Sequence, residues 1–273
     1  MKQAVVIIPV YKRVIEAEER ISLQQTFRVL GNHPIVLVCP KNLNVSEYER
    51  LALSEKVVLE VERFDDEFFN GIKGYNRLLL SECFYRCFSM YNYILICQPD
   101  AYVFKDELEE WCEKGYDYMG APLFGRFSDT EFHINQGRVG NGGFSLRRVR
   151  TYLDFFNGKK PVFRFKAIPQ IIRFREKPFN RWAVWLLMTL GWRNTPRSVA
   201  RHWKYNEDDF WSGFLSITNY ALKKPSVREA MHFAFERFPS EVFGITRELP
   251  FGCHAWRKYQ YETFWKDYIE INE

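Results

Sequence analysis

Short apolar runs alternate with longer stretches of mixed polarity over the first 120 residues of the chain. An apolar run of about four to eight residues is typical of a strand buried on both faces. Apolar residues spaced three and four apart are typical of a helix with one buried face. The repeated order of strand and helix predicts an α/β fold with a mixed, mainly parallel sheet flanked by helices. We expect strands at residues 4–10, 34–39, 57–64, 93–97 and 116–119, and helices at residues 14–30, 46–53, 75–91 and 105–114.

The second half of the chain has a different composition. Residues 120–143 are rich in loop-forming residues and end in a glycine cluster. Residues 159–204 are rich in Trp, Phe and Pro and contain twelve Lys or Arg against one acidic residue, Glu176. We interpret this stretch as a basic insertion or subdomain over the sheet edge, within a single domain of residues 1–273. A further helix is expected at residues 206–222.

Composition and charge narrow the class of protein. Hydrophobic residues make up 47% of the chain and charged residues 27%, which argues against disorder. The net charge of +5 does not indicate nucleic-acid binding by itself, and the Pro- and Trp-rich basic stretch does not suit a groove-reading helix. Its charge would instead attract phosphates. These could belong to an anionic membrane or a lipid-linked ligand, or the stretch could form a basic flap over the phosphates of a bound nucleotide. The six cysteines form no disulfide pattern, and the apolar stretch 182–192 is shorter than the roughly 20 residues of a membrane-spanning helix. We expect a cytoplasmic protein, with a peripheral contact at the inner face of a membrane.

A carboxylate follows the most apolar of the expected strands. Residues 93–97 (YILIC) lead directly into Gln98-Pro99-Asp100. The carboxyl edge of an open α/β sheet is where ligands bind, and a carboxylate there could hold a divalent cation against a diphosphate. Alternatively, Asp100 begins a turn or caps the following helix.

A glycine cluster, Gly140-Asn141-Gly142-Gly143, precedes the segment FSLR. Glycine permits positive φ and lets a ligand approach the backbone closely, so this segment is a candidate binding loop. It lacks the spacing of a dinucleotide fingerprint, and a simple glycine hairpin is the alternative.

Three consecutive acidic residues, Glu207, Asp208 and Asp209, follow Asn206 and precede an aromatic pair. Acidic residues at a helix start stabilise the helix dipole, but three in a row exceed that need. A carboxylate with a suitable pKa can take a proton from an acceptor hydroxyl. Trp211 could stack on a sugar, although packing in the core is an equal alternative.

A histidine, His254, lies near the C-terminus within FGCHAW. It could be a polar residue that is satisfied within the core. Neutral imidazole is also a common ligand for ions such as Mn²⁺, beside carboxylate and phosphate oxygens.

The order of QPDAYVF, GAPL, VGNGGFSLR, NEDDFW and FGCHAW resembles an uncharacterised family of GT-A-type glycosyltransferases associated with surface polysaccharides. It is more distantly similar to the beta-1,4-galactosyltransferase pattern, over roughly residues 64–256. The resemblance implies a GT-A fold and a divalent cation, Mn or Mg, held by Asp100 and His254. It further implies that Asp208 is the general base and that Glu207 is its acceptor-binding neighbour.

The sequence departs from this pattern at Gln98, which stands where the first acid of the DXD motif is expected. That change removes a charge and would weaken or relax the dependence on metal. We expect the nucleotide-sugar donor to lie along the sheet edge and Trp211 to join Glu207 on the acceptor side. The expected donor-binding residues are Pro9, Val10, Tyr11, Arg13, Asp65, Lys73, Asn76, Arg77, Gln98, Asp100, Asn141, Gly142 and Gly143.

The sequence therefore predicts the transfer of a sugar from a nucleoside-diphosphate sugar to a hydroxyl of a glycan or lipid-linked acceptor. The match of Asp208 to the general base of the resembled family implies that the transfer inverts the sugar. Two alternatives stay open. A nucleotidyltransferase would also place acids at a sheet edge, although no Gly-rich phosphate loop with Lys follows the first strand. A non-catalytic carbohydrate- or lipid-binding protein could keep the same fold. The prediction of a glycosyltransferase depends on whether Asp100, Asp208 and His254 meet in one pocket.

Overall fold

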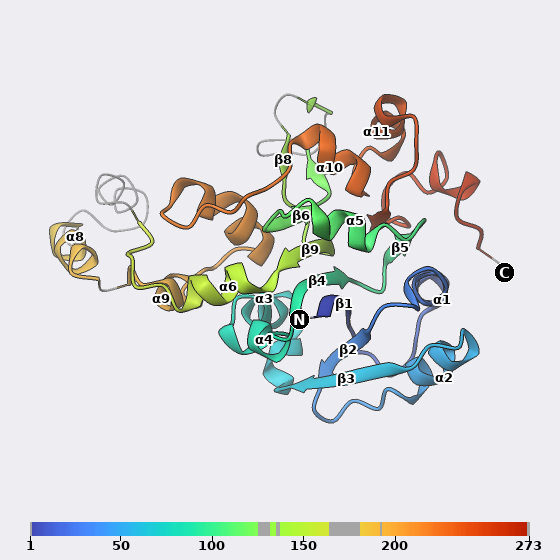
Figure 1. The fold of residues 1–273 in the computed structure, drawn as a ribbon, viewed down its shortest axis with the longest axis horizontal. Coiled ribbons are helices and arrows are strands. Elements are labelled where there is room, and N and C mark those ends of the chain that lie inside the picture. Colours follow the sequence, from blue (N-terminus) through green and yellow to red (C-terminus); the bar gives the residue numbers. More distant parts are fainter. Residues whose placement is uncertain (1, 125–131, 135–136, 164–180, 192, 272–273) are drawn as a thin grey trace.

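The computed structural model of the protein describes residues 2–124, 132–134, 137–163, 181–191 and 193–271. A six-stranded sheet lies at its centre in the order β3-β2-β1-β4-β9-β6, with helices on both faces (Figure 1). The first four of these strands are parallel, and β9 runs antiparallel between β4 and β6. The predicted mixed, mainly parallel α/β sheet is confirmed. Its strands are β1 (Lys2–Pro9), β2 (Ile35–Pro40), β3 (Leu59–Phe64), β4 (Tyr91–Cys97), β6 (Tyr118–Gly120) and β9 (Phe144–Arg148).

The central strands are buried on both faces, as their continuous apolar runs require. In β1, the side chains of Ala4, Val6 and Ile8 enter one hydrophobic core, while Val5 and Ile7 enter the other. This alternation follows from the two-residue period of a strand. The first core is covered by α1 (Ala17–Leu30), α2 (Ser46–Ser54) and α5 (Leu108–Glu113), and the second by α3 (Gly71–Leu79), α4 (Glu82–Cys87), α6 (Val149–Phe156) and α9 (Pro196–Arg201).

Two expected helices differ from the prediction. The helix expected at residues 75–91 is two helices, because the Ser81 hydroxyl accepts a hydrogen bond from the Phe84 amide and caps α4 as a new helix. The helix expected at residues 206–222 is instead a π-helical turn, η5 (Asp209–Gly213), followed by a 3-10 turn, η6 (Phe214–Ile217). Gly213 at their junction disfavours a regular α-helix.

A small second sheet brings the C-terminal part of the chain to the end of β4. Its strands are β10 (Ala234–Phe235), β11 (Gly252–His254) and β5 (Ala101–Val103). Because β11 pairs with β5 in antiparallel register, His254 lies opposite Ala101. The remaining elements are a hairpin of β7 (Pro122–Leu123) and β8 (Arg138–Val139), the helices α8 (Arg181–Thr189), α10 (Val227–Phe233) and α11 (Pro239–Thr246), and the 3-10 turns η1 (Asp66–Phe69) and η7 (Trp265–Asp267).

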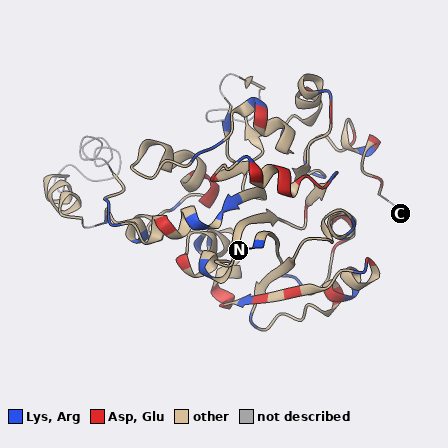
Figure 2. Cartoon of the chain, in the orientation of Figure 1, with Lys and Arg blue, Asp and Glu red and all other residues tan. Residues whose placement is uncertain are grey.

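The two described helices of the basic stretch lie to the left in Figure 1, with α9 beside α6 and α8 farther from the sheet. Neither helix carries an acidic residue, as the absence of red on them in Figure 2 also shows. Part of the predicted insertion, residues 164–180, lies outside the described residues. Within the described ranges, no helix has the length and apolarity that crossing a bilayer would demand.

Candidate functional site

A cleft of about 970 Å³ opens at the carboxyl ends of β1 and β4. The chain passes from β1 to β2 on one side, whereas β4 joins β1 on the other, so the strand order reverses here. Such a reversal leaves a crevice beyond the strand ends, where open α/β sheets bind ligands. Pro9 and Tyr11 line the cleft after β1, and Gln98 and Asp100 line it after β4.

Asp100 and His254 meet on one wall of this cleft. The β5–β11 register sets their backbones side by side, and the Ala255 amide donates to the Asp100 carbonyl. The His254 Nε2 atom lies 3.3 Å from Asp100 Oδ1 and 3.1 Å from Gln98 Oε1. On the other side of the ring, Nδ1 lies 3.2 Å from Glu236 Oε1. The imidazole is therefore held between two carboxylates and one amide oxygen.

The charges of Asp100 and Glu236 stabilise that of His254 on this wall. Burial lowers the pKa of His254, but Asp100 and Glu236 outweigh it and raise this pKa to about 10. Burial also raises the pKa of Asp100, but the charge and hydrogen bond of His254 outweigh that effect and lower it. In the protein without a bound cation, His254 is consequently an imidazolium that pairs with ionised Asp100.

The same donors suit a divalent cation that is shared with a substrate. No cluster of three or more His, Cys, Asp or Glu able to hold a metal occurs within the residues that the structure describes. Mg²⁺ and similar ions, however, take one or two protein ligands together with substrate phosphates. Glu236 on Nδ1 orients His254 so that Nε2 faces Asp100, as the outer partners of metal-binding histidines do. Asp100 and His254 thus fit a cation that is completed by a diphosphate.

The glycine cluster allows two other segments to approach this wall. A Cβ atom on Gly143 would lie 2.2 Å from His254 Nε2, and one on Gly142 would lie 2.5 Å from Glu207 Oε1. Neither glycine has a positive φ, so left-handed backbone is not the reason for glycine at these two positions. Glycine is required because side chains from residues 207 and 254 pack directly on the loop. The loop is itself fixed by the Asn141 Oδ1 atom, which accepts from the Gly143 amide at 2.9 Å.

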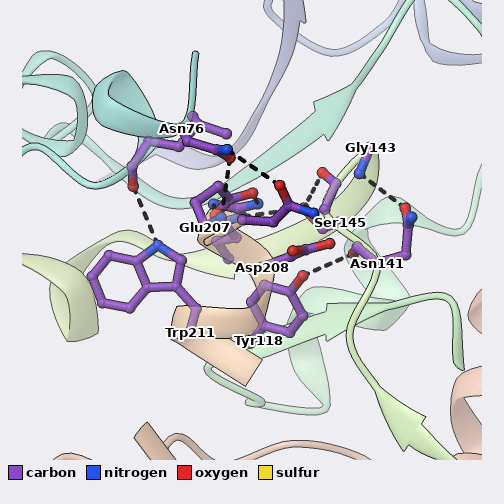
Figure 3. A network of polar contacts seen from close by, with 12 residues as sticks. Asn76, Tyr118, Asn141, Gly143, Ser145, Glu207, Asp208 and Trp211 are labelled. Atoms are coloured by element: carbon purple, nitrogen blue, oxygen red, sulfur yellow. Dashed lines mark hydrogen bonds and ion pairs between the residues drawn. The ribbon is translucent and has the colours of Figure 1, made fainter. Parts of the chain in front are cut away.

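Glu207 forms a buried ion pair beneath the cleft. Its two carboxylate oxygens each accept from the guanidinium of Arg147 at 2.8 Å, and both side chains are almost fully buried. Arg147 also donates to Tyr85 and Ser145, so the pair belongs to a wider network (Figure 3). Asn76 accepts from the Glu207 amide at 3.0 Å and ties this turn to α3. Glu207 therefore fixes the backbone that carries Asp208.

Asp208 lies at the start of the η5 turn with its carboxylate beside the Asn141–Gly143 loop (Figure 3). Its Oδ1 atom accepts from the Asp209 amide at 2.7 Å. Burial raises the pKa of Asp208 to about 7, and the charges of Glu207 and Asp209 add to this effect. A carboxyl group with this pKa can exchange a proton near neutral pH.

The structure thus places Asp100, Asp208 and His254, from three distant segments, around a single cleft. Several other predicted residues line it as well. These are Pro9, Tyr11, Asn76, Gln98, Asn141, Gly142, Gly143 and Glu207.

Six predicted residues lie outside the cleft, and four of them lie in the core or at the surface away from it. Trp211 is fully buried, packs against Tyr152 and donates to the Leu79 carbonyl, so the expectation that it stacks on an acceptor is wrong. Val10 packs in the core, since it continues the apolar alternation of β1. Arg13 is exposed and does not line the cleft, and Asp65 is exposed and pairs with Lys41.

Lys73 and Arg77 also lie outside the cleft, which corrects the prediction that they bind the donor together with Asn76. On α3, positions 72, 75 and 76 share the face that lines the cleft. Positions 73 and 77, four residues apart, share a different face and line a second groove of about 730 Å³. Asn76 lines both spaces.

The sequence reasoning missed three residues of the site. Arg147 follows the glycine cluster within FSLR and could have been paired with the acidic run, because a buried Arg needs a carboxylate. Glu236 and Lys258 also line the cleft, and no local pattern marks either of them. Their positions depend on the small second sheet and on the turn after β11.

Comparison with solved structures finds glycosyltransferases at low identity. Core-mannan synthase A from Aspergillus fumigatus, in its Mn/GDP form, is 13% identical with a TM-score of 0.45, covering 76% of this chain and 68% of that one. The galactosyltransferase LgtC is 12% identical with a TM-score of 0.46, covering 92% and 86%. The glycosyltransferase GlyE from Streptococcus pneumoniae is 10% identical with a TM-score of 0.48, covering all of this chain and 61% of that one. Similarities at this level do not bear on activity, which depends on the residues in the cleft.

The sequence itself has a family match. No curated protein matches the chain. Residues 58–254 match the family described as Protein of unknown function (DUF5672). Because that match spans more than half of the sequence, the chain belongs to the DUF5672 family.

Proposed function

We propose that the protein is a glycosyltransferase of the GT-A kind, which transfers a sugar from a nucleoside-diphosphate sugar to an acceptor hydroxyl with inversion. One observation carries the proposal. A cleft at the strand-order reversal gathers a carboxylate–imidazole pair, Asp100 and His254, and a carboxyl group with a pKa of about 7, Asp208. Such a transfer needs two chemical functions, namely ligands for a cation that offsets the charge of the diphosphate, and a base.

The donor would lie between the ends of β1 and β4. Tyr11 is 61% exposed at the cleft and offers an aromatic face to the nucleotide base. Asp100 and His254 would hold Mn²⁺ or Mg²⁺ against the diphosphate. The bound cation would offset the charge that develops on the departing diphosphate. Lys258 lines the same wall and would add a positive charge to it.

Asp208 would act on the acceptor. Its carboxylate accepts the proton of the acceptor hydroxyl while that oxygen forms a bond to the anomeric carbon. The bond from the anomeric carbon to the diphosphate oxygen breaks, and the nucleoside diphosphate leaves with the bonding electrons. Attack from the face opposite the leaving group inverts the anomeric configuration. The buried Arg147–Glu207 pair keeps Asp208 in place throughout.

Gln98 would make the dependence on metal milder than a second carboxylate at this position would. It lies at 3.1 Å from His254 Nε2 and carries no charge. We expect the affinity for Mn²⁺ without a nucleotide to be weak, and to rise when a nucleoside diphosphate supplies further oxygen ligands.

The test is to incubate the pure protein with a panel of nucleotide sugars and Mn²⁺, and to measure release of the nucleoside diphosphate. Hydrolysis of one donor, abolished by Asp100→Asn, supports the proposal. Asp106→Asn is a matched control, because Asp106 is bound to His33 away from the cleft. Binding of a nucleotide sugar without any turnover, in the presence of acceptor glycans, would favour a non-catalytic binding protein.

We also propose a peripheral contact with an anionic membrane, through α8. Trp182, Leu186 and Leu190 are spaced four apart and are 71%, 43% and 75% exposed, so they form one apolar stripe on the outer face. Met188 on the inner face is buried against the body of the protein. An exposed apolar stripe within a basic stretch suits the interface of an anionic bilayer. Loss of vesicle flotation at low salt on Trp182→Ser supports this contact, and wild-type protein that does not float with anionic vesicles contradicts it.

A further inference from the structure

A second groove of about 730 Å³ lies next to the cleft, and the proposed transfer leaves it without a role. The two spaces meet at Asn76, which lines both. The floor of the groove is apolar and its rim is cationic. Phe68, Leu80, Phe156, Ala200 and Trp203 form the floor, and Lys73, Arg77, Arg197, Arg201 and Lys204 supply the positive charge.

The positive charge of this rim is only partly neutralised. Glu82 is the one carboxylate among the residues that line the groove, and it already pairs with Arg197 at 2.6 Å and with Arg86. Lys73, Arg201 and Lys204 are exposed and form no ion pair within the described parts of the chain. A concave surface with excess cations concentrates anions, and Lys and Arg side chains are the usual partners of a phosphate or diphosphate group.

The groove also leads toward the proposed base. Tyr205 lines the groove, and Asp208, three residues later, lines the cleft. The chain between them is held to α3, because Asn76 donates to Asn206 at 3.3 Å and accepts from the Glu207 amide at 3.0 Å. Because Asn76 lines both spaces, a ligand with its phosphate on the rim that crosses Asn76 would present a hydroxyl on the side of Asp208.

We propose that this groove binds the acceptor, and that the acceptor is a lipid-linked sugar phosphate or diphosphate. The phosphate lies on the cationic rim, the start of the lipid chain covers the apolar floor, and the sugar points into the cleft. A soluble sugar phosphate would leave the apolar floor uncovered, which is why we assign the lipid ester. The identification as acceptor rests on the proposed function, whereas the binding of the lipid phosphate does not.

The experiment measures binding of farnesyl phosphate by titration calorimetry, with farnesol, glucose 1-phosphate and inorganic phosphate as comparison probes. We expect farnesyl phosphate to bind most tightly. The double substitution Arg201→Glu/Lys204→Glu is expected to weaken that binding by about tenfold or more, because it reverses two charges on the rim. The control Arg50→Glu/Lys56→Glu makes the same change in net charge at exposed positions on and just after α2, and it should bind as the wild type does. Thermal unfolding of both variants verifies that they are folded.

Glucose 1-phosphate binding as tightly as farnesyl phosphate would overturn the assignment of a lipid ester. Farnesyl phosphate binding that the rim variant leaves unchanged would overturn the groove as the site. Donor hydrolysis, measured on the same variants, separates the two proposals. The rim variant should hydrolyse the donor at the wild-type rate, since its substitutions lie outside the cleft. If neither the wild type nor either variant hydrolyses a donor, while the rim variant still loses binding of farnesyl phosphate, the assignment of the groove stands and the proposed function fails.

Discussion

Replacing Asp208 by Asn tests the environment of the proposed base without relying on catalysis. The pKa of Asp208 is raised from 3.8 to about 7 by burial and by the charges of Glu207 and Asp209. The folded protein therefore holds this proton at pH values where the unfolded chain has already released it. Stability must consequently fall as the pH rises from about 4 to about 7. Asn has nearly the same shape and cannot titrate, so the variant lacks this contribution.

The size of this change in stability follows from the shift in the pKa of Asp208. Each pKa unit corresponds to about 1.4 kcal/mol, so the full shift costs the wild type about 4 kcal/mol above pH 7. Between pH 5 and pH 8, the part of this cost that develops is about 2–3 kcal/mol. His254 also titrates differently in the folded state, because its pKa is raised to about 10, and this too reduces stability above pH 6.5. The contribution of His254 is shared by both proteins and cancels in their difference.

The assay is urea unfolding of the wild type and Asp208→Asn at pH 5 and pH 8, with EDTA present and no donor. We expect the free energy of unfolding of the variant, relative to the wild type, to increase by about 2–3 kcal/mol from pH 5 to pH 8. A relative change near zero would refute the raised pKa. In the transfer assay, the same variant should lose about 10²–10⁴-fold in rate while still binding the donor. Unchanged turnover would refute the role of Asp208 as base.

Three further predictions concern the cleft. In the wild type, the rate of transfer should rise with pH through an apparent pKa of about 7 and then level off, because the base must be ionised; a rate that falls over this range would contradict the assignment. Gly143→Ala should lower the free energy of unfolding by about 1–3 kcal/mol and weaken Mn²⁺ binding in calorimetry, because its methyl group would displace the ring of His254. Gly244→Ala, where a methyl group meets no atom within 4 Å, is the control, and equal effects at the two positions would count against the argument. Glu207→Gln should lower the free energy of unfolding in urea by about 3–5 kcal/mol, because it leaves Arg147 buried without its counter-charge. The same variant should lower the apparent pKa of the transfer rate, and an unshifted pKa would show that Glu207 does not act on the base.

Several of the residues that the sequence placed correctly lie at the ends of buried strands. The apolar runs of β1 and β4 determine where each strand stops, and parallel neighbours stop at the same edge of the sheet. Tyr11 and Asp100 could therefore be assigned to one crevice from local pattern alone. Lys73 and Arg77 could not be separated from Asn76 in this way. Which face of α3 each residue occupies depends on how the helix packs, and residues one apart on a helix point in different directions.

Trp211 marks a second limit of the sequence reasoning. An aromatic residue after an acidic run has the same local pattern whether it faces a ligand or the core. Its burial is decided by Tyr85 and Tyr152, which belong to two other helices. The burial of the Arg147 charge could not be predicted for the same reason, since its partner Glu207 lies 60 residues away in the chain. Contacts between distant elements determine both outcomes, and periodicity within one element contains no information about them.

The glycine cluster explains why these separate motifs occur together. Gly142 is in contact with Glu207 and Gly143 with His254, so one short loop touches the segment of the proposed base and the proposed metal ligand at once. The Gly143 carbonyl also accepts from the Gln98 amide at 2.9 Å, which joins the loop to the end of β4. A side chain at either glycine would move the carboxylates apart. The spacing between the proposed cation-holding wall and the proposed base thus depends on the absence of two Cβ atoms. The proposed transfer therefore requires glycine at both positions, because only then can the acidic run, the late histidine and the strand-end carboxylate act on one substrate.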